Sequence, residues 1–105
     1  MSYRIIIGPR ARRDLRDFAD LLRDYSEDFA QEQLDRLLVT ISTYLAETPL
    51  IWSHFFLTGA PYRGYLFRVG RRSHYWIIYT VDEEARIVEM LRFWNASRDP
   101  EALEI

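Results

Sequence analysis

Residues 65–94, with the sequence YLFRVGRRSHYWIIYTVDEEARIVEMLRFW, decide the fold of this chain. Apolar and polar residues alternate along 65–69, and apolar residues dominate 74–81 and 86–94. Two short polar segments, GRRS and DEE, separate the three runs. Alternation at a period of two residues, with tight polar turns between the runs, is typical of β-hairpins. The stretch therefore predicts three consecutive strands of an antiparallel meander.

The residues before this stretch predict one strand and two helices. Residues 3–7 are apolar and stop at Gly8-Pro9, which favours a strand followed by a helix with proline in its first turn. Apolar residues then recur at spacings of three and four over 9–48, and Ser26 can cap a second helix in that range. The apolar stripe of the first helix is Ala11, Leu15, Phe18, Leu22 and Tyr25. Its opposite face carries the pairs Arg10/Asp14, Arg13/Asp17 and Arg16/Asp20, each four residues apart.

The predicted fold is a small α+β single domain spanning residues 1–105. Its order is β-α-α-β-β-β, with the helical hairpin packed on one face of an antiparallel-meander sheet. A length of 105 residues and a mass of 12.6 kDa suit one domain.

Composition excludes several classes of site. The chain has no cysteine, which excludes disulfides, zinc–thiolate sites and cysteine nucleophiles. His54 and His74 have no nearby cluster of carboxylates, so we expect no metal and no cofactor. No apolar run is long enough to span a membrane, and we expect a cytoplasmic protein. All 14 cationic side chains are arginine. The net charge of −2 argues against non-specific electrostatic binding of nucleic acid by the chain as a whole.

The predicted sheet has more apolar surface than two helices can cover. The residues that parity assigns to the outer face are Leu66, Arg68, Trp76, Ile78 and Thr80. The last strand is also apolar on both faces, and its parity is ambiguous because Glu89 interrupts one face and Arg92 the other. A binding partner is the favoured occupant of the outer face. The alternative is that the uncharged segment 50–62 or the C-terminal tail folds across it.

The element order and three motifs resemble the RelE/ParE superfamily, the toxins of bacterial type II toxin–antitoxin modules. The segment 11–15 (ARRDL) resembles the Ala-x-x-Asp-Leu helix start of that superfamily, and 74–79 (HYWIIY) is similar to its Tyr-Arg-Ile-Ile-Tyr strand. The segment 91–100 (LRFWNASRDP) resembles the C-terminal end of ParE and plasmid-stabilisation toxins, in which a hydrophobic strand is followed by Ala-x-Arg-Asp. The resemblance spans nearly the whole chain.

The superfamily has two activities, and the resemblance favours the ParE-like one. RelE-type members cut mRNA on the ribosome with Lys and Arg on the outer sheet face, often helped by a C-terminal Tyr or His. ParE-type members inhibit DNA gyrase. Arg68 matches one basic position of the nuclease branch, but Leu66 and Trp76 lie where that branch has Lys and Arg. No Tyr or His follows Tyr79. We therefore expect a gyrase or topoisomerase inhibitor that is not an enzyme.

Two alternatives remain open at this point. The first is a ribosome-dependent mRNA endonuclease whose catalytic residues would be Arg68, Arg92 and Arg98. The second is a binding module on the same fold that harms no cell.

The resemblance also implies two interaction surfaces. A ParD/RelB-like antitoxin would form a hetero-oligomer with the toxin through a C-terminal segment that folds as it binds. The expected antitoxin-binding residues are Leu22, Trp52, Phe55, Trp76, Ile78 and Trp94. The expected target-binding residues are Arg68, Trp76, Arg92, Trp94 and Arg98. Arg68 and Arg92 are also expected to pair with acidic residues of the antitoxin.

Overall fold

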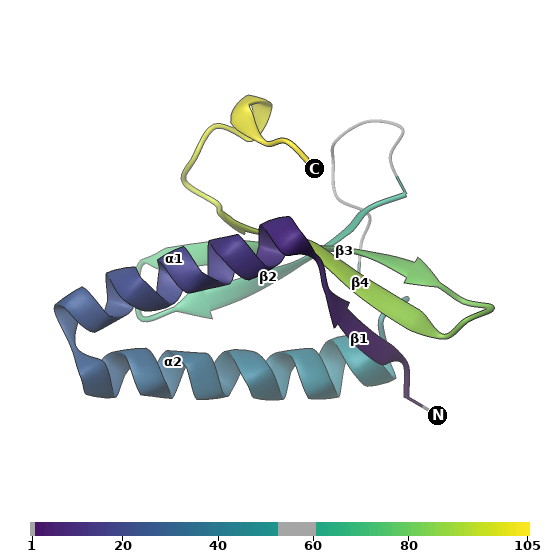
Figure 1. The fold of residues 1–105 in the computed structure, drawn as a ribbon, viewed down its shortest axis with the longest axis horizontal. Coiled ribbons are helices and arrows are strands. Elements are labelled where there is room, and N and C mark those ends of the chain that lie inside the picture. Colours follow the sequence, from purple (N-terminus) through teal and green to yellow (C-terminus); the bar gives the residue numbers. More distant parts are fainter. Residues whose placement is uncertain (1, 53–60) are drawn as a thin grey trace.

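The computed structural model describes residues 2–52 and 61–105 and confirms the predicted element order (Figure 1). The elements are β1 (Arg4–Ile7), α1 (Pro9–Tyr25), α2 (Glu27–Thr40), a π-helical turn η1 (Ile41–Leu45), β2 (Arg63–Val69), β3 (Ser73–Asp82), β4 (Ile87–Asn95) and a 3-10 turn η2 (Pro100–Ala102). The four strands form one mixed sheet in the order β1-β4-β3-β2, in which β1 is parallel to β4 and the other pairs are antiparallel.

The helices begin where the sequence predicts. Pro9 occupies the first turn of α1, where its missing N–H leaves no hydrogen bond unmade. Ser26 caps α2, since its Oγ accepts a hydrogen bond from the Phe29 N–H at 3.2 Å. The second helix was expected to run unbroken to residue 48, but it widens into η1 over its last turns. No helix in the described parts of the chain is long and apolar enough to cross a membrane.

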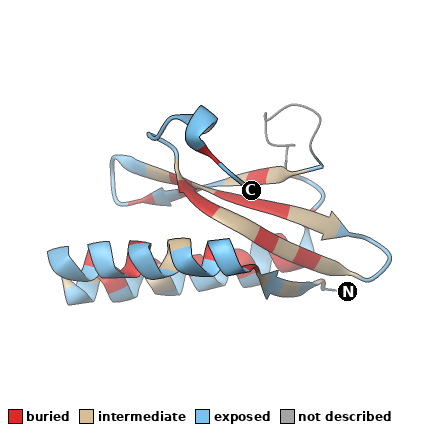
Figure 2. Ribbon diagram, turned by 45° about the horizontal axis from the view of Figure 1, so that its top comes forward, coloured by how far each residue is buried: buried red, intermediate tan, exposed pale blue. Residues whose placement is uncertain are grey.

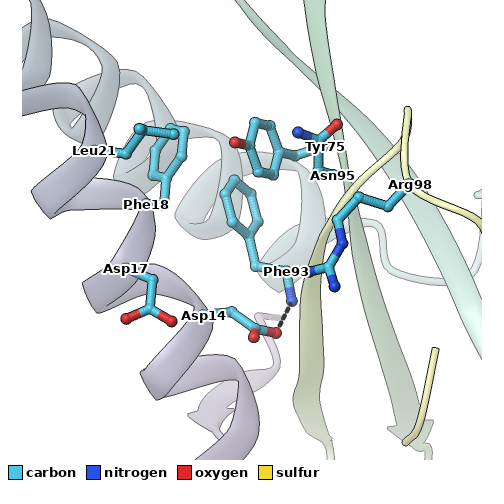
Figure 3. Close-up of a pocket in the computed structure, with 8 residues that line it drawn as sticks. All are labelled: Asp14, Asp17, Phe18, Leu21, Tyr75, Phe93, Asn95 and Arg98. Carbon is cyan, nitrogen blue, oxygen red and sulfur yellow. Dashed lines mark hydrogen bonds between the residues drawn. The ribbon is translucent and has the colours of Figure 1, made fainter. Parts of the chain in front are cut away.

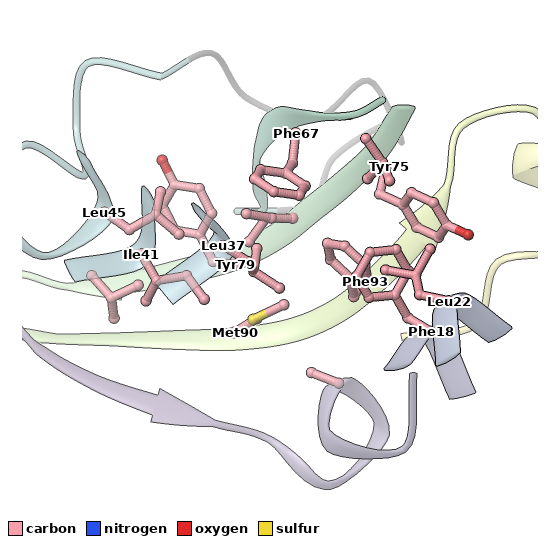
Figure 4. Close-up of a cluster of buried hydrophobic side chains, with 14 of the residues drawn as sticks. Phe18, Leu22, Leu37, Ile41, Leu45, Phe67, Tyr75, Tyr79, Met90 and Phe93 are labelled. Carbon is pink, nitrogen blue, oxygen red and sulfur yellow. The ribbon is translucent and has the colours of Figure 1, made fainter. Parts of the chain in front are cut away.

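The main core lies between the helices and one face of the sheet (Figure 4). Phe18 of α1 packs edge-on against the rings of Tyr75 and Phe93, at centroid distances of 4.9 Å for both. Ile77 and Met90 are completely buried in the same cluster. The predicted parity of β2 and β3 is therefore confirmed: Phe67, Val69, Tyr75, Ile77 and Tyr79 all face the helices.

A β-bulge explains why the last strand is apolar on both faces. Ile78 pairs with Arg92 and Tyr79 pairs with Met90, so Leu91 has no partner on β3. The extra residue shifts the parity by one position. Met90 before the bulge and Phe93 after it consequently face the same core, although they are three residues apart.

The C-terminal tail lies on the side of the sheet away from the helices (Figure 2). Residues 96–105 turn back after β4, pass through η2 and end above the sheet (Figures 1 and 2). The molecule thus has three layers: the helices, the sheet and a short tail. The two faces of the sheet are covered very differently.

Candidate functional site

The outer face of the sheet is organised in rows of paired residues across three strands. The middle row is Leu66, Trp76 and Trp94, which lie opposite one another on β2, β3 and β4. Arg68 lies opposite His74 in a row on one side of it. The row on the other side pairs Gly64 with Ile78 and Ile78 with Arg92. The structure therefore brings the residues predicted for this face together, and the strand pairing gives their order across β2, β3 and β4.

The tail closes part of this face. Leu103 is buried against Ile78 and Trp94, whose exposed fractions are 0% and 3%. Trp76 and Ile105 pack against the same cluster and are half-buried. The tail therefore covers Ile78 and Trp94, which is the alternative to an open face that the sequence left. That these two residues bind the antitoxin stays a prediction. The indole N–H of Trp94 is buried with no acceptor among the described residues.

Arg92 is held in a nearly buried ion pair with Asp14 of α1. Its Nε donates to Asp14 Oδ2 at 2.7 Å, and its Nη2 donates to Asp14 Oδ1 at 3.1 Å. The side chains of Arg92 and Asp14 are only 13% and 16% exposed. Such a bidentate pair fixes both groups in place. The spacing of four residues predicted that Asp14 pairs with Arg10, but the guanidinium of Arg10 lies 3.9 Å from the carboxylate of Glu104.

Asp14 joins all three layers of the molecule. Its Oδ2 also accepts the backbone N–H of Phe93 at 2.9 Å. Arg92 in turn donates through Nη1 to the backbone carbonyl of Glu104 in the tail. Helix, strand and tail are therefore connected through one carboxylate and one guanidinium. This arrangement gives Arg92 a structural role and leaves little of its side chain to meet a target.

Arg98 lies over the Trp94 ring at 4.4 Å from its centroid. Arg92 approaches the same ring at 5.1 Å, so Trp94 contacts two guanidinium groups. The Asn95 side chain holds the loop that places Arg98, because its Oδ1 accepts hydrogen bonds from the backbone N–H and the hydroxyl of Ser97. Arg98 itself is exposed. It is thus a cation presented to solvent from a fixed loop.

Arg98 also lines a pocket between α1 and the end of β4 (Figure 3). Asp14 and Asp17 lie on the helix side of this pocket, and Tyr75 and Asn95 lie on the sheet side. Burial raises the pKa of Tyr75, and a hydrogen bond with Asn95 offsets part of that rise. The Tyr75 hydroxyl therefore holds its proton at neutral pH and is a poor general base there.

The structure does not bring Arg68, Arg92 and Arg98 to one point. Arg68 is exposed on the edge strand β2, whereas Arg92 lies on β4. Their partners on β3, His74 and Ile78, are separated by roughly 13 Å at ~3.3 Å per residue. The three arginines consequently cannot hold a single phosphate without a large rearrangement.

The other residues predicted to bind the antitoxin lie on the helix side of the sheet or beyond the described part. Leu22 is 8% exposed and belongs to the main core. Trp52 packs against that core and lies edge-on to Tyr65 at 4.7 Å. Phe55 falls outside the described residues. Neither Leu22 nor Trp52 shares a surface with Trp76.

The residues that sequence reasoning missed are Asp14 and Leu103. Asp14 is the aspartate of the Ala-x-x-Asp-Leu motif, and that motif was the only signal that set it apart from the other carboxylates of α1. Leu103 carried no signal, because a single leucine in a short tail has no periodicity. Within residues 2–52 and 61–105, no three His, Asp or Glu side chains lie close enough to hold a metal ion.

Comparison with known proteins identifies the family. Searches of curated proteins and of solved structures give no match. Residues 5–100 match the family model described as the ParE toxin of the type II toxin-antitoxin system, parDE. That match begins within β1, takes in α1, α2 and the strands β2 to β4, and ends at the first residue of η2. The chain therefore belongs to the ParE toxin family of type II toxin–antitoxin systems.

Proposed function

We propose that this toxin inhibits DNA gyrase or a related topoisomerase by binding it, without cleaving RNA. We also propose that a cognate ParD/RelB-like antitoxin neutralises the toxin in the cytoplasm by forming a hetero-oligomer with it. Membership of the ParE family supports both statements, since a type II toxin acts within a module that also encodes its antitoxin.

The observation that carries the gyrase proposal is the apolar middle row of the outer face. Leu66 and Trp76 stand in this row where the nuclease branch of the superfamily has Lys and Arg. Arg92 is engaged by Asp14, so its charge is already neutralised. Among the residues of this face that the structure describes, no cluster of cations surrounds a proton donor. RNA cleavage there would forgo the ~10²–10⁴-fold that general acid–base catalysis contributes.

The exposed end of this face is the proposed target surface. It comprises Arg68 on β2, Trp76 on β3 and Arg98 in the loop after β4. An aromatic ring flanked by arginines is the composition that protein interfaces favour. Arg92 and Trp94 contribute by positioning Arg98 rather than by contact with the target.

The test compares both activities with one protein preparation. Purified toxin is added to a gyrase supercoiling assay and, separately, to a translation reaction whose mRNA is mapped by primer extension. We expect supercoiling to be inhibited and the mRNA to remain intact. Cleavage between codons with normal supercoiling would overturn the proposal and favour the endonuclease alternative.

A variant sharpens the test at the target surface. We expect Arg98→Ala to weaken gyrase inhibition about tenfold, the factor that corresponds to ~1.4 kcal/mol of binding free energy. The matched control is Arg16→Ala, which removes another exposed arginine, on α1. If Arg98→Ala inhibits as strongly as the control at equal protein concentration, Arg98 does not face the target.

A further inference from the structure

The first turns of α1 carry more positive charge than their neighbours neutralise. Arg10 and Arg13 are both exposed and lie three residues apart, on the same flank of the helix. The aspartate four residues after Arg10 is Asp14, and Asp14 is bound by Arg92. Among the residues that the structure describes, Arg13 has no carboxylate within ion-pair distance. The fold therefore leaves Arg10 and Arg13 without the counter-charges that the helix sequence offers.

The helix itself adds to this positive charge. The N-terminal end of a helix carries a partial positive charge, so cations are disfavoured there and anions are favoured. Helix α1 has no acidic residue in its first turn, and Gly8 at its N-cap provides no side-chain hydrogen bond. An anion beside this turn would offset both the helix dipole and the mutual repulsion of Arg10 and Arg13.

A small pocket lies between these arginines, β4 and the tail. The residues that line it are all charged: Arg10, Arg13, Asp14, Arg92 and Glu104. Its volume is about 240 Å³, below the roughly 300–1,000 Å³ that is typical of pockets for drug-sized ligands. Three guanidinium groups and two carboxylates leave an excess of one positive charge. The pocket therefore suits a small anion rather than an aromatic or apolar ligand.

The two sides of this pocket differ in how firmly they are held. Three of the five N–H groups of Arg92 donate to Asp14 and to the Glu104 backbone carbonyl, and the Arg92 side chain is only 13% exposed. The Glu104 side chain, by contrast, is 84% exposed, and its carboxylate lies 3.9 Å from Arg10, too far for a hydrogen bond. Because a surface pair of this kind is weak, an incoming anion can displace the carboxylate while the backbone carbonyl stays on Arg92.

Three arginines from two elements match a phosphate group better than a carboxylate. A phosphate group offers oxygens in several directions, and guanidinium groups recognise it through paired N–H donors. A terminal phosphate carries about −1.5 to −2 charges at pH 7, whereas each phosphate of a nucleic-acid backbone carries only one. Asp17 lies one turn further along α1, beside Asp14, and would repel the next phosphate of a backbone (Figure 3). The charges therefore favour a single terminal phosphate.

We propose that the pocket between Arg10, Arg13 and Arg92 binds a terminal phosphate group, either inorganic phosphate or the phosphate monoester of a small molecule. Arg10 and Arg13 would donate to the phosphate oxygens, and Arg92 would form the fixed wall behind them. The carboxylate of Glu104 would move into solvent. This binding site does not depend on which cellular target the toxin has.

The first experiment titrates the full chain, labelled with ¹⁵N, with inorganic phosphate while NaCl holds the ionic strength constant. We expect a saturable shift of the Arg92 Nε–H signal and of the backbone amide signals of Arg10 and Arg13. A shift that does not saturate at millimolar phosphate, or that is spread evenly over the arginines of the chain, would overturn the proposal.

Two competitors identify the source of the phosphate. AMP carries a terminal phosphate, whereas a short DNA duplex with 5′-hydroxyl ends carries only phosphodiesters. We expect AMP to displace inorganic phosphate and to reproduce the Arg92 shift, which would assign the site to phosphate monoesters. If inorganic phosphate binds and AMP does not, the proposal stands with inorganic phosphate as the ligand. If the duplex displaces phosphate more strongly than AMP does, the assignment to a terminal phosphate is wrong.

Charge-matched variants assign the binding to the pocket. Arg13→Gln should weaken phosphate binding about tenfold, because it removes a charged hydrogen-bond donor. Arg16→Gln, at an exposed arginine of α1 that does not line the pocket, should leave it unchanged. Glu104→Gln should strengthen binding about threefold by removing the competing carboxylate, whereas Glu101→Gln, at another exposed glutamate of the tail, should not. Equal effects of Arg13→Gln and Arg16→Gln would contradict the proposed site.

Discussion

The two faces of the sheet are buried by different means. On the helix side, α1, α2 and η1 cover a continuous core that includes Phe18, Ile77 and Met90. On the outer side, the buried cluster consists of Ile78, Trp94 and Leu103. The first cover spans most of two long helices, whereas the second is a short tail. The same strands thus belong to a large core on one face and a small one on the other.

The two covers differ in how they respond to the loss of a buried side chain. A buried side chain in a large core is surrounded on all sides, and its loss leaves a cavity that neighbours cannot fill. A tail has few contacts and can shift to fill a gap or leave altogether. We therefore expect the helix side to carry most of the stability and the outer side to carry the adaptable contacts.

The most direct comparison uses two adjacent isoleucines. Ile77 and Ile78 are both 0% exposed and lie on the same strand, but they face opposite sides of the sheet. We expect Ile77→Ala to lower the free energy of unfolding by about 4 kcal/mol, and Ile78→Ala by about 2 kcal/mol, because the tail can collapse into the smaller cluster. Urea denaturation of both variants measures the difference. Equal losses would mean that the two faces are equally rigid.

Asp14→Ala breaks the connection between the layers. It removes the partner of Arg92 and the acceptor for the Phe93 N–H. Because a nearly buried guanidinium is left unpaired, we expect a loss of about 3 kcal/mol in the free energy of unfolding.

The control for Asp14→Ala is the double variant Asp14→Ala/Arg92→Met, which removes both charges. It should be more stable than Asp14→Ala alone in the same urea titration. If the double variant is less stable than the single one, the cost does not come from an unpaired charge.

Leu103→Ala tests the tail by itself. Leu103 is 9% exposed and packs in the outer cluster. We expect a loss of about 2 kcal/mol, at the lower end of the range for buried leucines, because a terminal segment relaxes easily. Trp94 should become more accessible to acrylamide quenching in this variant. Unchanged quenching would show that Leu103 does not shield Trp94.

Tyr79→Phe tests how the stability of the helix side depends on pH. The Tyr79 hydroxyl donates to the Pro49 carbonyl at 2.7 Å, and its loss should cost about 1 kcal/mol. Burial raises the pKa of Tyr79, and attraction to Arg63 offsets part of that rise. The folded state therefore keeps this proton to a higher pH than the unfolded state does. Stability should fall as the pH rises above ~10, and it should fall less steeply in Tyr79→Phe than in the parent protein.

The sequence predicts the helix side of the fold well. Alternation at a period of two assigns Phe67, Val69 and Tyr75 to one face, and helical spacing assigns Phe18 to the surface that covers them. Local signals also place Pro9 and Ser26 at the helix starts. These features are visible because each depends on residues that are close together in the chain.

The outer face is harder to predict because its determinants are not local. The bulge at Leu91 changes the parity within β4, so the sequence of this strand does not show a continuous apolar or polar face. Asp14 and Arg92 are 78 residues apart, and the nearer Arg10 offered an i,i+4 pair that the fold does not use. Cover by the tail depends on Leu103, which no pattern distinguishes from an ordinary surface leucine.

We claim that the helix side forms the fold, whereas the tail only covers the outer face. Removing residues 99–105 tests this claim most directly, with unfolding followed by urea and by tryptophan fluorescence. We predict that residues 1–98 still unfold in one cooperative transition, with a loss of roughly 3 kcal/mol and emission from Trp94 shifted to longer wavelength. A truncated chain that does not fold cooperatively would contradict the claim.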